Sequence, residues 1–336
     1  MSEHGTTGGR VALAREAMAT RFELLLEGGD LVSLRAAGEQ ALDEIDRIEA
    51  QLSLYRATSE ISHLNARAAV EPVKVSPPVF DLLRRCREFW ELSDGAFDIT
   101  VAPLVRAWGF MHGSGRPPEP KAVAQARACV GMEEVDFDAR LRTVRFRRAG
   151  MMLDLGAVGK GYAIDLAVDV LREAGVSRAF IHGGTSTSFG LGMPLDGKPW
   201  RAAVLSDEAP AEAARLETPA AGVLGAGLLT AVTLTDRSLS VSGVRGKAFV
   251  AGGQTYGHVL DPRSGRPVQG AQVAAVAGVS AAETDALSTA LLVLGEDGFA
   301  RLRRRRPELE LFVAQPDGAG GLELRRRGFD DGAQGG

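Results

Sequence analysis

The sequence predicts an α+β fold in which mixed or antiparallel sheets are flanked by helices. Segments of alternating polar and apolar residues and segments of helical spacing follow one another without the strict strand–helix–strand order of a parallel sheet. The composition, 45% hydrophobic with 41 glycines that show no period of three, is that of a globular chain. A length of 336 residues exceeds what one compact core usually supports, so we expect either a large bilobal domain or two domains that share a cleft.

The first part of the chain predicts a strand followed by two helices. Residues 21–27 suit a strand, and residues 31–53 carry apolar side chains at helical spacing. Ser76 followed by Pro77 is typical of a helix start, and we expect that helix to end near Ser93.

The middle of the chain predicts a loop, a hairpin and a glycine-rich turn. A proline-rich loop at 116–120 leads into a short helix, and residues 135–146 alternate as a hairpin does. Residues 153–161 are expected to turn into a helix that runs to about Ala174, and residues 179–184 form a strand that ends in two glycines.

The last part of the chain predicts further strands around two helices. The expected elements are strands near 201–205, 229–235 and 238–242, a hairpin at Gly252-Gly253, a helix over 281–294, an arginine-rich helix, and strands near 309–314 and 322–326. We expect flexible termini at 1–10 and 331–336.

Charge and cysteine content exclude several classes of protein. The 39 basic and 43 acidic residues give a net charge of -4, which provides no electrostatic drive toward nucleic acid or anionic membranes. Cys86 and Cys129 are too few for a disulfide framework and lack the spacing of a zinc site. No apolar run is long enough for membrane insertion, and the N-terminus shows neither a signal segment nor a lipidated cysteine, so we expect a cytoplasmic protein.

The segment LDLGAVGKGYAID, residues 153–165, is the first candidate site. Its three glycines and Lys160 stand where a strand turns into a helix, an arrangement that can bind a phosphate through backbone N–H groups. It is not a Walker A loop, because Gly161 occupies the position of the required hydroxyl residue. A plain glycine turn is the alternative interpretation.

Two further segments carry candidate ligands or catalysts. Asp285 and Thr289 are four residues apart, so on a helix both oxygens lie on one face and could bind a hard ion such as Mg²⁺. An aspartate at this place could equally be a helix cap. His258 stands at a loop edge and could act as a general base, although a single histidine is more often structural.

In order and spacing, these segments together resemble the ApbE family of flavin transferases. The matching segments are AMATRF (17–22), YRATSEISHLN (55–65), GAFDITVAPLVRAWGF (95–110), DLGAVGKGYAID (154–165), Gly183-Gly184, SGVRGKAF (242–249), HVLDPRSGRPV (258–268) and TDALSTALLVLG (284–295). The resemblance implies an ApbE-like, T-fold-related bilobal fold, with one domain over residues 11–330 that is built of two interwoven lobes. It also implies Mg²⁺-dependent transfer of FMN from FAD to a threonine of an acceptor flavoprotein, with release of AMP.

The resemblance also implies roles for individual residues. Asp285, Thr289 and the carbonyl of Ala157 would bind Mg²⁺, His258 would be the base, and Lys160 would assist catalysis. The residues expected to contact FAD are Met18, Tyr55, Ala96, Phe97, Asp98, Asp154, Lys160 and Leu260. The expected partners are FAD and the acceptor protein; the oligomeric state is left open.

Three segments depart from the family pattern. The usual Met-Gly-Thr is Met18-Ala19-Thr20, the double glycine is followed by Thr185 and then 186–188, and Ser242-Gly243 is followed by 244–246. Two other functions therefore stay open, an FAD pyrophosphatase that forms FMN and AMP, and a flavin-binding protein without turnover.

Overall fold

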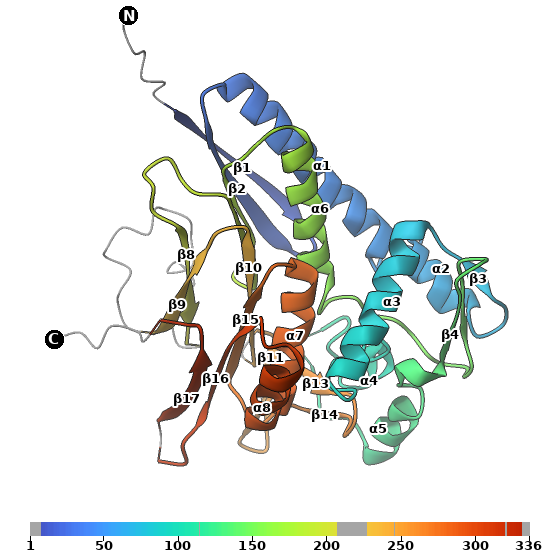
Figure 1. Ribbon diagram of the computed structural model, residues 1–336. Helices are drawn as coiled ribbons and strands as arrows, with labels where there is room; N and C mark the ends of the chain where they lie inside the picture. Colours follow the sequence, from blue (N-terminus) through green and yellow to red (C-terminus); the bar gives the residue numbers. More distant parts are fainter. Residues whose placement is uncertain (1–7, 114, 207–226, 245, 320, 331–336) are drawn as a thin grey trace, which may run out of the picture.

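An antiparallel sheet of eight strands forms the centre of the molecule (Figure 1). The computed structural model describes residues 8–113, 115–206, 227–244, 246–319 and 321–330. In spatial order the strands are β1 (Gly9–Ala17), β2 (Thr20–Gly28), β6 (Ala179–Gly183), β7 (Thr187–Leu191), β10 (Arg237–Gly243), β15 (Val273–Gly278), β16 (Glu310–Pro316) and β17 (Leu322–Arg327). Because side chains alternate along a strand, the sheet offers one apolar face to helices and another to a hairpin.

Helices cover one face of the sheet and a hairpin covers the other (Figure 1). The helical layer consists of α1 (Leu31–Leu52), α6 (Gly159–Glu173) and α7 (Ala281–Leu294), and α8 (Glu296–Arg305) follows α7. On the opposite face lie β8 (Trp200–Leu205) and β9 (Leu228–Leu234), whose side chains pack against Phe180 and Leu239 of the sheet.

The remaining elements form a second lobe beside the helical layer. They are the helices α2 (Glu60–Arg67), α3 (Pro77–Leu92), α4 (Ala102–Ala107) and α5 (Pro120–Arg127), the 3-10 helix η1 (Met132–Glu134), the sheet of β3 (Val73–Lys74), β5 (Thr143–Phe146) and β4 (Val135–Asp138), and the hairpins β11 (Ala248–Ala251) with β12 (Gln254–Gly257) and β13 (Leu260–Asp261) with β14 (Arg266–Pro267).

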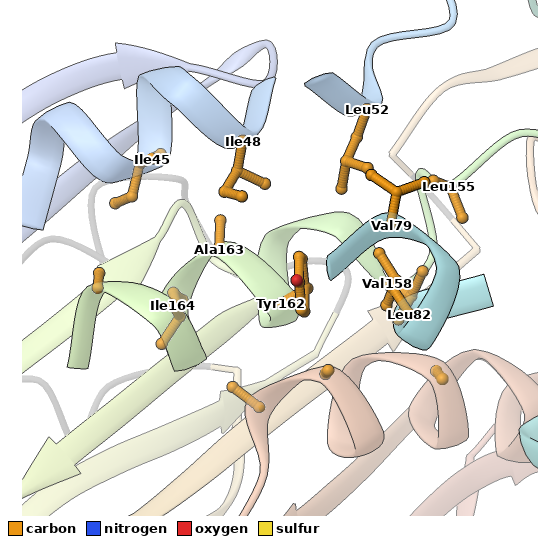
Figure 2. Packing of buried hydrophobic residues seen from close by; sticks show 14 of the residues in the cluster. Ile45, Ile48, Leu52, Val79, Leu82, Leu155, Val158, Tyr162, Ala163 and Ile164 are labelled. Carbon is orange, nitrogen blue, oxygen red and sulfur yellow. The ribbon is translucent and has the colours of Figure 1, made fainter. Parts of the chain in front are cut away.

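The two lobes share one hydrophobic core. Ile45 and Ile48 of α1 point toward Ala163 of α6, and Val79 of α3 and Val158 belong to the same cluster (Figure 2). Each of these five side chains is fully buried. Burying a branched aliphatic side chain contributes roughly 1.5–3 kcal/mol, so this continuous cluster joins the second lobe to the helical layer.

The elements expected from the sequence are present, and several others were not expected. Strands β1, β7 and β15 and helices α2 and α4 are absent from the sequence prediction. Strand β1 begins at Gly9, so residues 9 and 10 of the expected flexible terminus belong to the sheet, whereas residues 1–7 and 331–336 lie outside the described residues. Both cysteines are free, and no helix in the described ranges has the length and hydropathy needed to cross a membrane.

The turn between β1 and β2 holds two residues in a strained backbone conformation. Ala17 pairs with Thr20, so Met18 and Ala19 form a two-residue loop, with φ of 50° and 57°. Positive φ at both positions is the pattern of a type I′ turn, in which glycine or asparagine is preferred. A side chain in this region costs roughly 1–2 kcal/mol relative to glycine.

Replacing Ala19 with glycine should therefore stabilise the protein. We expect Ala19→Gly to raise the free energy of unfolding by up to about 1 kcal/mol, because relief of backbone strain exceeds the added entropy of the unfolded chain. Denaturant unfolding measures this. Ala14→Gly, at an exposed position within β1, is the control and should destabilise. Equal destabilisation by both changes would contradict the strain argument.

Candidate functional site

One cavity of about 1000 Å³ brings the predicted site residues together. Eleven of the twelve line it, from both halves of the chain: Tyr55, Ala96, Phe97, Asp98, Asp154, Ala157, Lys160, His258, Leu260, Asp285 and Thr289. Met18 is not among the lining residues, but its neighbour in the turn, Ala19, is. This volume is at the upper end of the range for small-molecule and cofactor sites.

The glycine-rich turn lets the first turn of α6 lie directly against the start of α7. A Cβ atom on Gly161 would stand 2.0 Å from the carbonyl oxygen of Ala281, so only glycine fits. Across this contact the Gly161 N–H donates to Oδ2 of Asp285 at 3.0 Å. The free N–H at the start of α6 is therefore satisfied by a carboxylate of the protein. The glycine at position 161 therefore serves close packing between two helices, a role that neither the phosphate-loop nor the plain-turn interpretation of the sequence included.

A second carboxylate connects the same helices in the opposite direction. Asp165 of α6 accepts hydrogen bonds from the N–H groups of Ala281 and Ala282, at 2.7 and 3.0 Å, and from the Ser280 hydroxyl at 2.8 Å. Burial raises the pKa of Asp165, while these three hydrogen bonds oppose that shift. Each helix thus supplies a carboxylate to the N-terminus of the other.

The three candidate metal ligands are all oxygen atoms. Asp285 is 4% exposed, and Gly161 is the one hydrogen-bond donor to its carboxylate among the described residues. Thr289 lies one turn later, where its hydroxyl is 3.2 Å from the hydroxyl of Ser242. Together with the Ala157 carbonyl, this donor set suits a hard ion such as Mg²⁺. Within the described ranges there is no cluster of three or more His, Cys, Asp or Glu side chains, and the candidate set contains a single carboxylate.

The two candidate catalytic side chains line the same cavity. The Lys160 ammonium donates a hydrogen bond to the Gly156 carbonyl at 3.3 Å. An ammonium group has three N–H donors, so the other two point in other directions. His258 accepts a hydrogen bond at Nδ1 from the N–H of Lys247, at 3.3 Å, so neutral His258 carries its proton on Nε2. Burial, followed by the charges of Lys160 and Lys247, lowers the pKa of His258 and outweighs the opposing effect of that hydrogen bond. His258 is therefore neutral at neutral pH.

The acidic residues expected to contact FAD are held by their own loops. Asp98 accepts from the N–H and hydroxyl of Thr100, at 2.7 and 2.6 Å, and from the N–H of Met132 at 3.3 Å. Burial nevertheless raises the pKa of Asp98 to about 6. Asp154 accepts from the N–H of Gly156 at 2.8 Å, and burial raises its pKa as well. Both side chains shape the cavity wall through these turns.

The aromatic residues differ in what they offer the cavity. Tyr55 is 61% exposed and makes an edge contact with His112, with ring centroids 5.9 Å apart. Phe97 is buried against Phe89 and forms part of the wall. Trp108 belongs to the core under α4, where its indole N–H donates to the Gly265 carbonyl at 2.9 Å.

Comparison with known proteins gives one consistent result. The family model described as ApbE matches residues 18–313. The chain belongs to the ApbE family. A protein of Klebsiella pneumoniae named FAD:protein FMN transferase is 30% identical over 283 residues, covering 83% of each chain. One of the same name from Treponema pallidum is 30% identical over 335 residues, covering 93% of this chain and 88% of the other.

Solved structures of ApbE proteins have the same fold. The ApbE protein of Thermotoga maritima superposes with a TM-score of 0.82 at 26% identity, covering 95% of this chain and 97% of that one. The flavinyl transferase ApbE of Pseudomonas stutzeri gives a TM-score of 0.80 at 27% identity, with 95% of each chain covered. The ApbE resemblance predicted from the motifs is confirmed, as is an α+β fold of antiparallel sheets flanked by helices.

The segments that depart from the ApbE pattern lie at the cavity. Thr185 and residues 186–188 line it. Gly246 lies under the imidazole of His258, where a Cβ atom would be 2.9 Å from Cε1. Arg245 lies outside the described residues. Asp165 and Ser242 lie within the segments that match the ApbE family. Neither was predicted as a site residue, because its position in the sequence does not indicate which groups it contacts.

The helix contact at Gly161 should be indispensable to the fold. We expect Gly161→Ala to lower the free energy of unfolding by about 2 kcal/mol or more, because the methyl group would overlap the Ala281 backbone. Gly159→Ala is the matched control two residues earlier, where a Cβ atom meets nothing within 4 Å, and it should be neutral or stabilising. Thermal and denaturant unfolding compare the two, and similar stabilities would contradict the packing argument.

Proposed function

We propose that this protein transfers FMN from FAD to a threonine hydroxyl of an acceptor flavoprotein and releases AMP, with Mg²⁺ bound by Asp285, Thr289 and the Ala157 carbonyl. The observation that carries the proposal is the single cavity that joins these oxygens to Lys160 and His258 in a chain of the ApbE family. The relatives named FAD:protein FMN transferase support flavin and a protein as the two substrates.

The reaction is an in-line displacement at the phosphorus on the flavin side of the pyrophosphate. A bond forms between the threonine oxygen and this phosphorus, and the bond to the bridging oxygen breaks, so that AMP leaves with that oxygen. Mg²⁺, when bound, would neutralise charge on the pyrophosphate. The ammonium of Lys160 would stabilise the charge that develops on the phosphoryl oxygens.

The proton of the threonine hydroxyl goes to His258. Because Nε2 of the neutral ring already carries a proton, Nδ1 is the atom that accepts it. The 3.3 Å hydrogen bond from Lys247 to Nδ1 is long, and the incoming hydroxyl would replace it. Burial of the imidazole keeps it neutral and therefore able to accept a proton.

An assay with three readouts tests the proposal against the two other functions. The protein is incubated with FAD, Mg²⁺ and a candidate acceptor that carries a threonine target motif. Covalent flavin on a denaturing gel supports transfer. Free FMN and AMP without labelling would instead identify a pyrophosphatase, and unchanged FAD a binding protein.

Asp285 is the residue whose replacement tests the metal site most directly. We expect Asp285→Asn to lower Mg²⁺-dependent transfer by about 100-fold or more, since an amide oxygen is a weaker ligand without the negative charge. The amide oxygen can still accept from Gly161, so the melting temperature should change little. Isothermal titration with Mg²⁺ in the presence of FAD measures binding separately from turnover. Near wild-type activity would contradict the metal assignment.

The lowered pKa of His258 predicts the pH dependence of transfer. Protonation inactivates a general base, so activity should fall as the pH falls through the His258 pKa, which lies below the ordinary value of 6.5. We expect a plateau across neutral pH and a decline that begins on the acidic side of 6.5. His258→Gln should lose most activity and also this acidic limb. A limb centred above 6.5 in the wild-type enzyme would refute the assignment.

A further inference from the structure

The cavity extends beyond the proposed active site onto the hairpin face of the sheet. We call this extension the β8 groove. One wall is strand β8, through Arg201, Ala202, Ala203 and Leu205. The floor comes from the large sheet, where the apolar side chains of Phe180, Leu239 and Val241 lie next to the polar His182 and Ser188. Residues 185–188, where the chain departs from the ApbE pattern, also line the cavity.

One edge of strand β8 is directed into the groove. Residues 201, 202 and 203 are consecutive and all line the cavity, although their side chains alternate between the two faces of the hairpin. Ala202 and Val204 pack toward the large sheet, whereas Ala203 is exposed on the other side. Residues on both faces can line one groove only if the strand's edge is directed into it.

This edge has no strand partner among the described residues. β8 and β9 form a two-stranded sheet that is separate from the large sheet, and β8 pairs with β9 alone. The outer edge of β9 is engaged instead, since Asp330 donates its N–H to the Ala231 carbonyl at 3.1 Å. An open strand edge presents a row of backbone donors and acceptors to which an extended chain can add.

We propose that an extended segment of the acceptor protein binds in the β8 groove as an added strand along β8. This inference rests on the proposed function, which requires a polypeptide hydroxyl to reach the flavin-side phosphorus. The groove and the site of Asp285, Thr289 and His258 are parts of one cavity, so a segment paired with β8 can carry its hydroxyl residue into that site.

The groove also indicates the chemistry of the segment. Backbone pairing along the six residues of β8 spans about 20 Å and requires an extended conformation rather than a particular sequence. The apolar floor at Phe180, Leu239 and Val241 suits one aliphatic or aromatic side chain. Ser186 and Ser188, near the active site, would contact residues next to the hydroxyl, so the 185–188 segment would select among acceptors.

Hydrogen exchange of the backbone amides tests the pairing directly. The probe is an acceptor flavoprotein that the wild-type enzyme labels, with its modified threonine changed to alanine so that the complex does not turn over. In the presence of Mg²⁺ and FAD, we expect those amides of residues 201–205 that do not already donate to β9 to exchange at least tenfold more slowly when this probe is added. Residues 322–327 of β17, the last strand of the large sheet, are the internal control and should not change. Unchanged exchange at these edge amides of β8, or equal protection of β17, would overturn the inference.

A pair of substitutions on the hairpin provides a second measurement. Ala203→Trp places a large side chain at the groove and should raise the KM for the acceptor at least tenfold, without a matching rise in the KM for FAD. Thr233→Trp lies on the partner strand, opposite Arg201 and outside the cavity lining, and should leave both constants unchanged. Equal effects of the two changes would count against the groove.

The two proposals fail in different ways. If the wild-type enzyme labels no acceptor, the transfer function fails and the inference fails with it. If labelling proceeds but neither β8 exchange nor the Ala203→Trp constants respond to the acceptor, only the groove is refuted.

Discussion

The exchange of carboxylates between α6 and α7 is the constraint on which the site depends. Asp165 of α6 receives the N–H groups at the start of α7, and Asp285 of α7 receives the Gly161 N–H at the start of α6. A carboxylate at a helix N-terminus is worth about 1–2 kcal/mol when partly buried, because it satisfies free donors and complements the helix dipole. Since each helix caps the other, neither can shift without breaking both contacts. Lys160, Ala157 and Asp285 therefore keep fixed relative positions.

A chain of hydroxyl groups fixes α7 to the sheet in the same way. Ser238, Ser240 and Ser242 alternate along β10 and so face α7 together. The Thr284 hydroxyl lies 3.0 and 2.9 Å from those of Ser238 and Ser240, and Ser242 lies 2.9 Å from Ser288. Small polar side chains permit a close approach between helix and strand while leaving few donors unsatisfied. The last hydroxyl of the series contacts Thr289, so this packing also orients a candidate metal ligand.

The sequence predicted the elements with strong periodicity and missed those that depend on their surroundings. Helix α1 and the turn into α6 follow from apolar spacing and glycines, because local signals determine them. Strand β15, with the sequence VAAVAG, is buried along its whole length, and its alanines carry no strand preference, so only pairing with β10 and β16 makes it a strand. The order of the motifs along the chain identified Asp285, Lys160 and His258 as candidate site residues. It did not identify Asp165, because the partners of this carboxylate at 280–282 are more than a hundred residues away in the sequence.

The position of the cavity at the end of the sheet explains how one site can serve both a nucleotide and a protein. On the helical face, the ends of α6 and α7 carry Lys160 and the proposed ligands of Mg²⁺, and these two cations would neutralise a pyrophosphate. On the other face, the cavity meets a strand edge and an apolar floor, which suit an extended polypeptide. The two surfaces meet at residues 185–188, where β6 turns into β7 at the double glycine. This turn is also where the chain departs from the ApbE pattern. If the proposals hold, substitutions in it would change the acceptor without altering the proposed metal ligands.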